Sequence, residues 1–480
     1  MKILLINPIV DFYSEKINNF PHITLGLLYL AAIAEKKGHE VIVKNSHQSN
    51  FKRILKEIRP DIVGITCLTV QYNQALKIAE IIKKYDKKII TVAGGYHPTI
   101  LWKEILEETD FFDYLCIGEG ELTFGDLLDA ISQVKSVDEI KGLAFKKDKK
   151  IIFTGERELI SDLDTLPLPA RHLVSFNVPF ISSSRGCRNN CKFCSVKNFY
   201  GKQYRRRSVE EVIKEINLIS NQGNKRICII DDNFGGDREY ILKISKAIRD
   251  AGLDDVVFEI DCSIAILADE LVLKALQEMN VKTIGVGIQS SINEFRQYLN
   301  LIGDSEFLEK FFREAKKYNF DFWLFFPLNS GKENETIKMI TDDLRSFMKI
   351  VKSNSDGKAK FFCELTVLIP FPGTDLEKDF VKRGIKIKKD WPLFRQKFCT
   401  YNYNDINENN LLNIIREVDP EIFIPLAGKN NKKLAFWNLI FLTDISFSLK
   451  IKIIVEDFYL DLIKRINFHQ RLKFFYKNYF

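Results

Sequence analysis

Short apolar runs alternate with longer amphipathic stretches along most of the chain. In the N-terminal part the apolar runs predict buried strands, and residues 25–38, which end in a glycine, have the pattern of a helix. Strands that alternate with helices indicate βαβ units and a doubly wound parallel sheet, the Rossmann-like form of the α/β class. Ligands of such sheets bind at the carboxyl ends of the strands. The predicted strands are residues 2–7, 40–44, 62–67, 88–95 and 114–118.

A second series of strands and helices begins at residue 180. Ser208, followed three positions later by Glu211, has the arrangement of a capping box and marks the start of a helix. The six strands predicted in this series are too few for a closed eight-stranded barrel, so we expect a partial (β/α)6 barrel. They are residues 180–184, 226–230, 257–263, 283–290, 321–327 and 363–370.

Two prolines just before residue 170 separate the two series, because proline blocks helix formation and extends the backbone before it. We therefore divide the chain into a first domain of residues 1–140, a linker of residues 141–172 that contains a short hairpin, and a barrel domain of residues 173–375. Residues 376–480 form a third, mostly helical region that we expect to cap the barrel.

The composition is that of a globular protein from a reducing compartment. The 480 residues suffice for two or three domains, and the hydrophobic share of 46% allows each a full core. The nine cysteines are odd in number and clustered once, which indicates a metal site rather than a disulfide framework. The N-terminal apolar run is too short for a signal peptide, so we place the chain in the cytoplasm. A net charge of +7 is weak evidence for nucleic acid, and we expect no such partner.

Three cysteines, Cys187, Cys191 and Cys194, follow the strand predicted at 180–184. Thiolates are the usual protein ligands of iron–sulfur clusters, and three of them on a [4Fe–4S] cluster leave one iron open for a small molecule. With His172, the same thiols could instead form a Cys3His zinc site. The place of the motif directly after a strand, and not in a small knuckle, favours the cluster.

The spacing C-x3-C-x2-C, with the aromatic Phe193 before the last cysteine, resembles the signature of the radical S-adenosylmethionine (SAM) enzymes. The resemblance implies that the open iron holds the amino and carboxylate groups of SAM. It also implies that the turn after the second barrel strand, formed by Asp231, Asp232 and Asn233, faces the SAM amino group, which we expect to contact the backbone rather than a carboxylate.

Two positions depart from the pattern of that family. Gln289, in the fourth predicted barrel strand, stands where related enzymes often carry a glutamate, and the resemblance implies that it contacts SAM. Residues 298–304 differ from the lysine–glycine turn that is usual after this strand. The proline-rich turn at 370–374, by contrast, matches the closing turn of the family.

Glycines and polar residues follow the carboxyl ends of the N-terminal strands, where bare backbone can approach a large ligand closely. The turns Gly-Gly-x-His-Pro-Thr at 94–99 and Gly-Glu-x-Glu at 118–121 make residues 1–140 resemble the cobalamin-binding domain that precedes many radical SAM enzymes. A Rossmann-like nucleotide-binding domain is the alternative, because paired glycines alone are a weak signal. The resemblance implies a corrinoid site lined by Thr66, Thr69, Gly94, Gly95, His97, Gly118, Glu119 and Glu121.

The Asp-x-His-x-x-Gly motif, which supplies a lower histidine to cobalt in methionine-synthase-type domains, is absent. His47 has the right spacing to its neighbours but follows the second strand and lacks both the aspartate and the glycine. Without the aspartate to orient its imidazole, we interpret His47 as a loop histidine. His97, in the Gly-Gly turn, is better placed for a polar contact with the corrinoid or for a structural role.

The resemblance implies a cobalamin-dependent radical SAM methyltransferase. Such an enzyme cleaves SAM reductively at a [4Fe–4S] cluster to give a 5′-deoxyadenosyl radical, and it methylates an unactivated carbon. A radical cyclase, or another ring-forming or carbon–carbon-coupling enzyme that uses cobalamin without methyl transfer, is the main alternative. A non-catalytic iron–sulfur or zinc protein is a more distant one. An electron donor such as flavodoxin or ferredoxin is implied, whereas the small-molecule or lipid substrate cannot be derived from the sequence.

The C-terminal region is rich in aromatic and basic residues. Residues 434–449 are apolar but too short to span a bilayer. Residues 450–480 mix lysine and arginine with phenylalanine, tyrosine and isoleucine, which suits a helix lying on anionic lipid. A cap over the barrel is the plainer interpretation, and peripheral contact with a membrane is the alternative.

Overall fold

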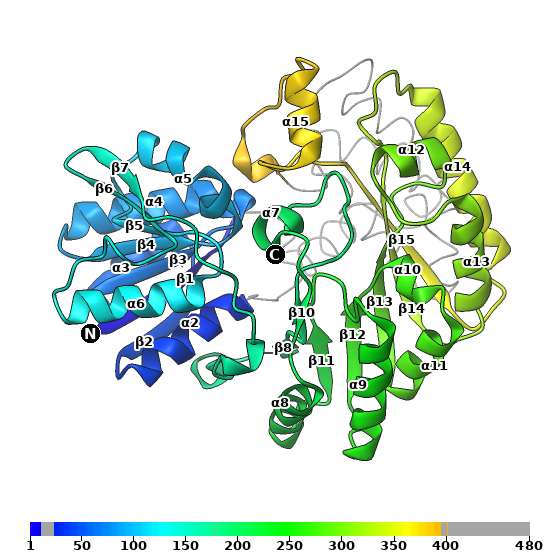
Figure 1. Ribbon diagram of the computed structural model, residues 1–480, viewed down its shortest axis with the longest axis horizontal. Helices are drawn as coiled ribbons and strands as arrows, with labels where there is room; N and C mark the ends of the chain where they lie inside the picture. Colours follow the sequence, from blue (N-terminus) through cyan, green and yellow to red (C-terminus); the bar gives the residue numbers. More distant parts are fainter. Residues whose placement is uncertain (11–23, 177, 395–400, 402–480) are drawn as a thin grey trace, which may run out of the picture. The chain divides into compact units, whose positions relative to one another are not determined.

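A computed structural model describes residues 1–10, 24–176, 178–394 and 401 of the protein. These residues form a seven-stranded and a six-stranded β-sheet, each with helices packed beside it (Figure 1), and a separate pair of short strands. Most of the C-terminal region lies outside the described residues, and with it the predicted helical cap and the predicted contact with lipid. In the part of the chain that the structure describes, no helix combines the length and apolar character needed to cross a membrane.

The N-terminal sheet has the strand order β2-β1-β3-β4-β5-β6-β7. Its first five strands pair in parallel, which confirms the predicted doubly wound sheet. Apart from β2, which has polar and exposed positions along its length, these strands are mostly buried, as expected for parallel strands covered on both faces. The five are β1 (Lys2–Pro8), β2 (Glu40–Ser46), β3 (Ile62–Thr66), β4 (Ile90–Gly94) and β5 (Tyr114–Cys116).

The hairpin of the predicted linker is part of this sheet. Strand β6 (Leu143–Lys147) pairs antiparallel with β5, and β7 (Lys150–Phe153) pairs antiparallel with β6. The N-terminal sheet therefore continues past residue 140 and ends in two antiparallel strands.

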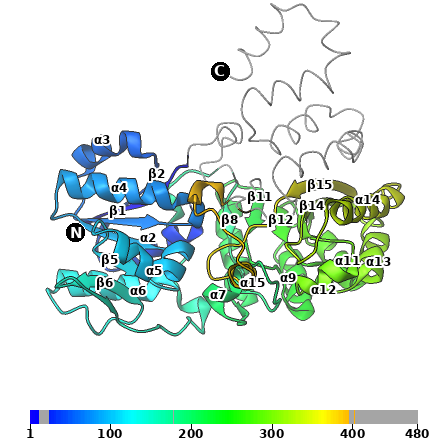
Figure 2. The same ribbon diagram turned by 90° about the horizontal axis from the view of Figure 1, so that it is seen from above.

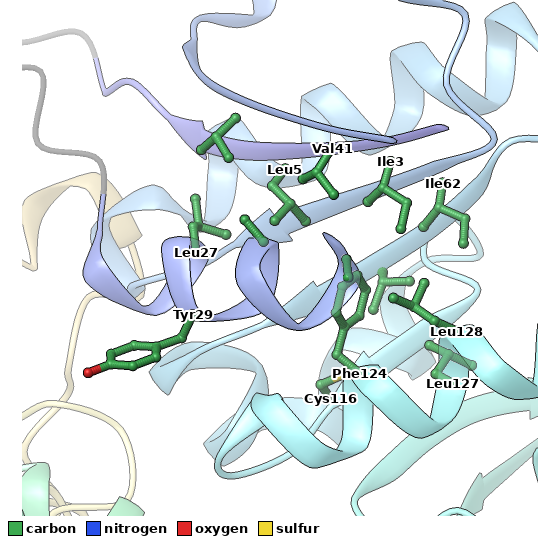
Figure 3. Packing of buried hydrophobic residues seen from close by; sticks show 14 of the residues in the cluster. Ile3, Leu5, Leu27, Tyr29, Val41, Ile62, Cys116, Phe124, Leu127 and Leu128 are labelled. Carbon is green, nitrogen blue, oxygen red and sulfur yellow. The ribbon is translucent and has the colours of Figure 1, made fainter. Parts of the chain in front are cut away.

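Helices cover both faces of the N-terminal sheet. On one face, α2 (Leu25–Lys36) and α6 (Gly120–Ser132) bury Leu27, Phe124 and Leu127 against Ile3 and other strand residues (Figure 3). The other face packs against α3 (Gln48–Ile58), α4 (Tyr72–Tyr85) and α5 (Tyr96–Glu108). Each fully buried side chain of this kind stabilises the fold by about 1.5–3 kcal/mol, so the two layers hold the strand ends firmly.

The second sheet has the order β15-β14-β13-β12-β11-β8, and all of its strands pair in parallel. Because β8 and β15 are its two edges, the described strands form an open, partial barrel, as predicted (Figures 1 and 2). Its strands are β8 (Phe180–Ile181), β11 (Arg226–Ile229), β12 (Val257–Asp261), β13 (Val281–Gly287), β14 (Asp321–Pro327) and β15 (Lys360–Thr366).

The connecting helices pack on the outside of the barrel strands. As predicted, α8 (Val209–Asn221) begins after Ser208, whose side chain accepts a hydrogen bond from the Glu211 N–H. Stacked, tilted and edge-to-face phenylalanine pairs pack between the later helices and the barrel strands. The longer helices are α9 (Arg238–Asp250), α11 (Glu270–Glu278), α13 (Ser305–Ala315) and α14 (Ile337–Ser353).

Candidate active site

A cavity of about 560 Å³ lies where the carboxyl ends of both sheets come together. This volume is within the usual range of ligand pockets. The N-terminal sheet and its following turns contribute Thr66, Gly94, Gly95, Gly118, Glu119 and Glu121, all of which the sequence predicted as corrinoid-lining. The barrel side contributes Phe180, Ser182, Ser184, Arg185, Ile230 and Asp232.

Two of the predicted glycines have backbone conformations that explain their place in the cavity wall. Gly95 has φ +105°, and a Cβ there would lie 3.0 Å from the carbonyl oxygen of Cys67. Gly118 has φ +79°, and a Cβ there would meet no atom within 4 Å. Gly95 therefore lets β3 and β4 approach each other closely, whereas Gly118 presents bare backbone to a ligand.

Much of the cavity wall is apolar, and sequence analysis missed this part. The cavity is lined by Leu25, Leu27 and Leu30 of α2. Leu68, which follows β3 and is 40% exposed, also lines it. The sequence signal is a large apolar residue, Leu68, directly after the strand predicted at 62–67. Tyr96 also lines the cavity and packs on Phe199, with ring centroids 4.5 Å apart.

Residues of this kind fit a corrinoid. Apolar side chains suit the faces of a macrocycle, and Gly118 has no side chain to obstruct its approach. The hydroxyl of Thr24, which lines the cavity, is buried without a hydrogen-bond partner among the described residues. A buried polar atom without a partner is costly, and a ligand group would satisfy it.

The structure places three other predicted or considered residues away from the cavity wall. Thr69 begins the short 3-10 helix Thr69–Gln71 and is buried. His97 is 2% exposed, packs between Tyr72 and Trp391, and has no hydrogen-bond partner on either ring nitrogen among the described residues. Burial lowers the pKa of His97 to about 3, so its imidazole is neutral.

His47 has a structural role at the start of α3. Its Nδ1 accepts a hydrogen bond from the backbone N–H of Ser49, and its Nε2 lies 3.2 Å from Gln74 Nε2. These contacts agree with the interpretation of His47 as a loop histidine. It does not line the cavity.

Cys187, Cys191 and Cys194 lie in the loop between β9 (Ser184–Arg185) and α7 (Val196–Tyr200) and are all half-buried. Burial, and then the negative charges that Cys194 and Cys187 carry when ionised, raise the pKa of Cys191 to about 12. The three thiols are thus near enough to interact electrostatically. A metal centre bound there has to displace their protons.

Contacts on both sides hold this loop, which we call the cluster loop (residues 186–195). The Lys192 N–H donates to the Leu299 carbonyl at 3.0 Å, and the Lys192 carbonyl accepts from the Leu376 N–H at 2.9 Å. The Lys192 ammonium also lies 3.7 Å from the centroid of the Tyr298 ring. The turns after β13 and β15 therefore fix the path of the cluster loop.

The three thiols and His172 do not form a single-ion site among the described residues. Among the residues that the structure describes, no group of three His, Cys, Asp or Glu side chains converges as a single metal ion requires. Cysteines that each bind a different iron of a cluster need not converge in this way. His172, which a Cys3His zinc site would use, instead lies 2.9 Å from the Glu35 carboxylate.

The residues of the turn after β11 have different tasks. Buried Asp231 accepts hydrogen bonds from the Ser183 N–H at 2.7 Å and from the Ser184 hydroxyl at 2.6 Å. Burial raises the pKa of Asp231, and these donors oppose the rise. Asp232 lines the cavity and accepts from the Gly186 N–H at 2.8 Å, which ties it to the start of the cluster loop.

Asn233 is buried in the same turn, and its Oδ1 accepts from the Ser263 N–H at 2.8 Å. Burial raises the pKa of Cys187, while the Asn189 backbone and the Asn233 side chain lower it. Asn233 thus favours the thiolate form that a metal needs.

Gln289 and Phe193 lie outside the cavity wall. Gln289 has φ +61°, a left-handed conformation that is uncommon for a residue other than glycine and is often found at functional sites. Phe193 is half-buried in the cluster loop. The unusual turn predicted after β13 is closed by buried Arg296, which donates hydrogen bonds to the carbonyls of Ile302 at 2.6 Å and Gly303 at 2.8 Å.

Comparison with known proteins agrees with the two parts of the site. Residues 19–128 match the B12 binding domain family, and residues 181–344 match the Radical SAM superfamily. An uncharacterised methyltransferase of Pyrococcus horikoshii is 30% identical over 406 residues, which cover 82% of this chain and 85% of that protein.

Two further relatives differ in their activity. The cytidylyl-2-hydroxyethylphosphonate methyltransferase of Streptomyces wedmorensis is 25% identical over 90% of this chain and 89% of that protein. An anaerobic magnesium-protoporphyrin IX monomethyl ester cyclase of Rubrivivax gelatinosus is 25% identical over 61% of this chain and 56% of that protein.

Two solved structures share the fold. The radical SAM methyltransferase TsrM of Kitasatospora setae, with cobalamin and a [4Fe–4S] cluster bound, superposes with a TM-score of 0.63 at 17% identity over 81% of this chain and 77% of that one. The cobalamin-dependent SAM radical enzyme OxsB, with aqua-cobalamin and SAM bound, gives a TM-score of 0.70 at 14% identity over 92% of this chain and 70% of that one.

Proposed function

Because the chain belongs to the cobalamin-dependent radical SAM methyltransferase family, we propose that it transfers a methyl group from SAM to an unactivated carbon of a small molecule. The observation that carries this proposal is the shared cavity. Its wall comes from the strand ends of the B12 binding domain on one side and from those of the radical SAM barrel on the other. A site of this kind brings a methyl carrier and a radical generator to the same substrate.

We propose that Cys187, Cys191 and Cys194 hold the cluster and that Asn233 supports the Cys187 thiolate. When bound, the cluster with SAM supplies a radical that removes hydrogen from carbon, and cobalamin supplies the methyl group. The Gly94–Gly95 and Gly118 turns hold the corrinoid by close backbone approach. The leucines of α2, together with Tyr96 and Phe199, exclude water from the space between the cofactors. An external donor such as flavodoxin or ferredoxin supplies the electron.

The experiment starts from the full chain, reconstituted without oxygen with iron, sulfide and hydroxocobalamin, and then given SAM and a reductant. We expect release of both 5′-deoxyadenosine and S-adenosylhomocysteine, because the two uses of SAM leave different products. Addition of small-molecule extracts with methyl-deuterated SAM then identifies the substrate by its mass shift. Protein that binds neither cobalamin nor an iron–sulfur cluster would overturn the proposal.

The cyclase relative motivates a second candidate, a ring-forming reaction without methyl transfer. Such an enzyme releases 5′-deoxyadenosine but no S-adenosylhomocysteine, and no deuterium reaches its product. The same assay therefore separates the two functions.

A further inference from the structure

Four charged side chains join the B12 binding domain to the radical SAM barrel, and we call them the clasp: Glu119, Glu121, Arg185 and Arg205. Arg185 donates to Glu119 at 2.8 Å and to Glu121 at 2.6 Å through its two terminal nitrogens. Arg205 donates to both oxygens of Glu119, at 2.8 and 3.0 Å. The clasp therefore connects the turn after β5 with the paired strands β9 and β10 (Arg205–Arg206).

Every member of the clasp is shielded from water. The exposed fractions of the side chains are 4% and 7% for Glu119 and Glu121, and 11% and 8% for Arg185 and Arg205. Arg185 also lies over the ring of Tyr29 in α2, at 5.3 Å from its centroid. Figure 3 shows Tyr29 at the edge of the apolar cluster, with its hydroxyl directed away from the other labelled side chains. Buried ion pairs contribute little net stability, but removal of one partner leaves an uncompensated buried charge and is strongly destabilising.

The clasp lines the proposed corrinoid site and lies two residues from the first cluster cysteine. Glu119, Glu121 and Arg185 line the cavity that we assign to the corrinoid. Arg185 is separated from Cys187 by Gly186 alone, and the Gly186 N–H is held by Asp232 at 2.8 Å. Hydrogen bonds to Arg185, followed by the chain through Gly186, therefore connect the turn after β5 with Cys187.

We propose that the clasp positions the cluster loop against the cobalamin cavity, so that binding of either cofactor favours binding of the other. The inference rests on the proposed function, since it requires that both cofactors bind. Ordering of the turn by a corrinoid fixes Glu119 and Glu121, and these carboxylates fix Arg185 and the residues that follow it. Because binding linkage is reciprocal, a loaded cluster must tighten cobalamin binding by the same factor.

Titration of the full chain with hydroxocobalamin, followed by absorbance, tests the proposal. The dissociation constant is measured for the cluster-loaded protein and for the same protein after removal of iron with a chelator. For the native chain we expect at least about fivefold tighter binding when the cluster is present, the lower end of typical coupling between sites. A native chain without such a difference would overturn the proposal.

The Arg185→Lys variant keeps the charge but loses the planar fork that bridges two carboxylates. We expect its linkage to fall to less than about twofold, whereas Arg206→Lys, the control, keeps the native linkage. Arg206 is the neighbour of Arg205 in β10, but its side chain is 44% exposed and pairs with Asp237. Retained linkage in Arg185→Lys, or equal loss in the control, contradicts the proposal.

A second variant guards against misfolding. Glu121→Gln removes the negative charge that pairs with Arg185, keeps an amide oxygen as acceptor, and leaves the pairing of Glu119 with Arg205 intact. It should load a full cluster and still show reduced linkage. A second readout is the electron paramagnetic resonance spectrum of the reduced cluster, which cobalamin should change in the native chain and leave unchanged in Glu121→Gln. Absence of any cobalamin binding in the native chain would count against the proposed function, whereas binding without linkage refutes the clasp alone.

Discussion

Gly186, between Arg185 and Cys187, is the position at which a single methyl group should damage the cluster loop most. It has φ +85°, and a Cβ there would lie 2.0 Å from the carbonyl oxygen of Gln203. A Cβ atom essentially never lies closer than 3.0 Å to a neighbouring heavy atom. The backbone at residue 186 and the backbone at Gln203 must therefore separate by about 1 Å. The contact is with backbone, which cannot turn aside as a flexible side chain can.

The magnitude of the Gly186→Ala effect has two parts. A left-handed conformation costs alanine about 1–2 kcal/mol. Overpacking that displaces backbone costs a further ~1–3 kcal/mol. We therefore expect the free energy of unfolding to fall by about 2–5 kcal/mol, with much reduced iron loading, because the displaced residue precedes Cys187.

Gly223→Ala is the matched control. Gly223 has nearly the same φ, +89°, but a Cβ there would meet no atom within 4 Å. It should lose only the conformational part, about 1–2 kcal/mol, and load iron normally. Urea unfolding of the iron-free chain gives the stabilities, and iron and sulfide analysis after reconstitution gives the loading. Equal losses of stability and equal iron contents in the two variants would refute the steric argument.

Three further predictions concern the cysteines and two histidines. Replacing the three cluster-loop cysteines together with alanine should abolish iron loading and SAM cleavage. The control Cys363→Ala removes a buried thiol outside the loop and should load iron normally. A four-iron cluster in the triple variant would disprove the ligand assignment. Electron paramagnetic resonance of the cob(II)alamin form should show no axial nitrogen splitting from His47. The His47→Ala variant should therefore give an unchanged spectrum. A splitting that vanishes in this variant would show that His47 is a cobalt ligand. Burial lowers the pKa of His97 from 6.5 to about 3. Between these two pH values the unfolded chain binds a proton at His97 that the folded chain does not bind. The folded state therefore keeps the full contribution of neutral His97 above pH 6.5 and loses stability as the pH falls below it. At about pH 5 this proton uptake lowers the free energy of unfolding by ~2 kcal/mol. Urea unfolding of His97→Phe should therefore show a loss of stability on acidification that is smaller by that amount. A loss equal to that of the native chain would contradict the prediction.

Sequence reasoning was sufficient where the physical cause is local. A parallel strand covered on both faces must be apolar along its length, so the short runs before residue 118 and after residue 180 predicted both sheets. Likewise, the spacing of the three cysteines and the glycines at the strand ends are short-range features. They placed the cluster loop and most of the predicted corrinoid residues at the strand ends, where the structure has them.

Tertiary structure decided which polar groups face the cavity and which face one another. Glu119 and Glu121 were predicted only as lining residues, and the structure adds their pairing with Arg185, which lies 66 and 64 residues further along the chain. His97 shares the glycine turn with the lining residues, yet the start of α5 turns it into the core between Tyr72 and Trp391. A strand end places a residue at the correct edge of a sheet. The direction of its side chain, and the partner of a buried charge, depend on packing against segments that are distant in the sequence, and no local pattern records these contacts.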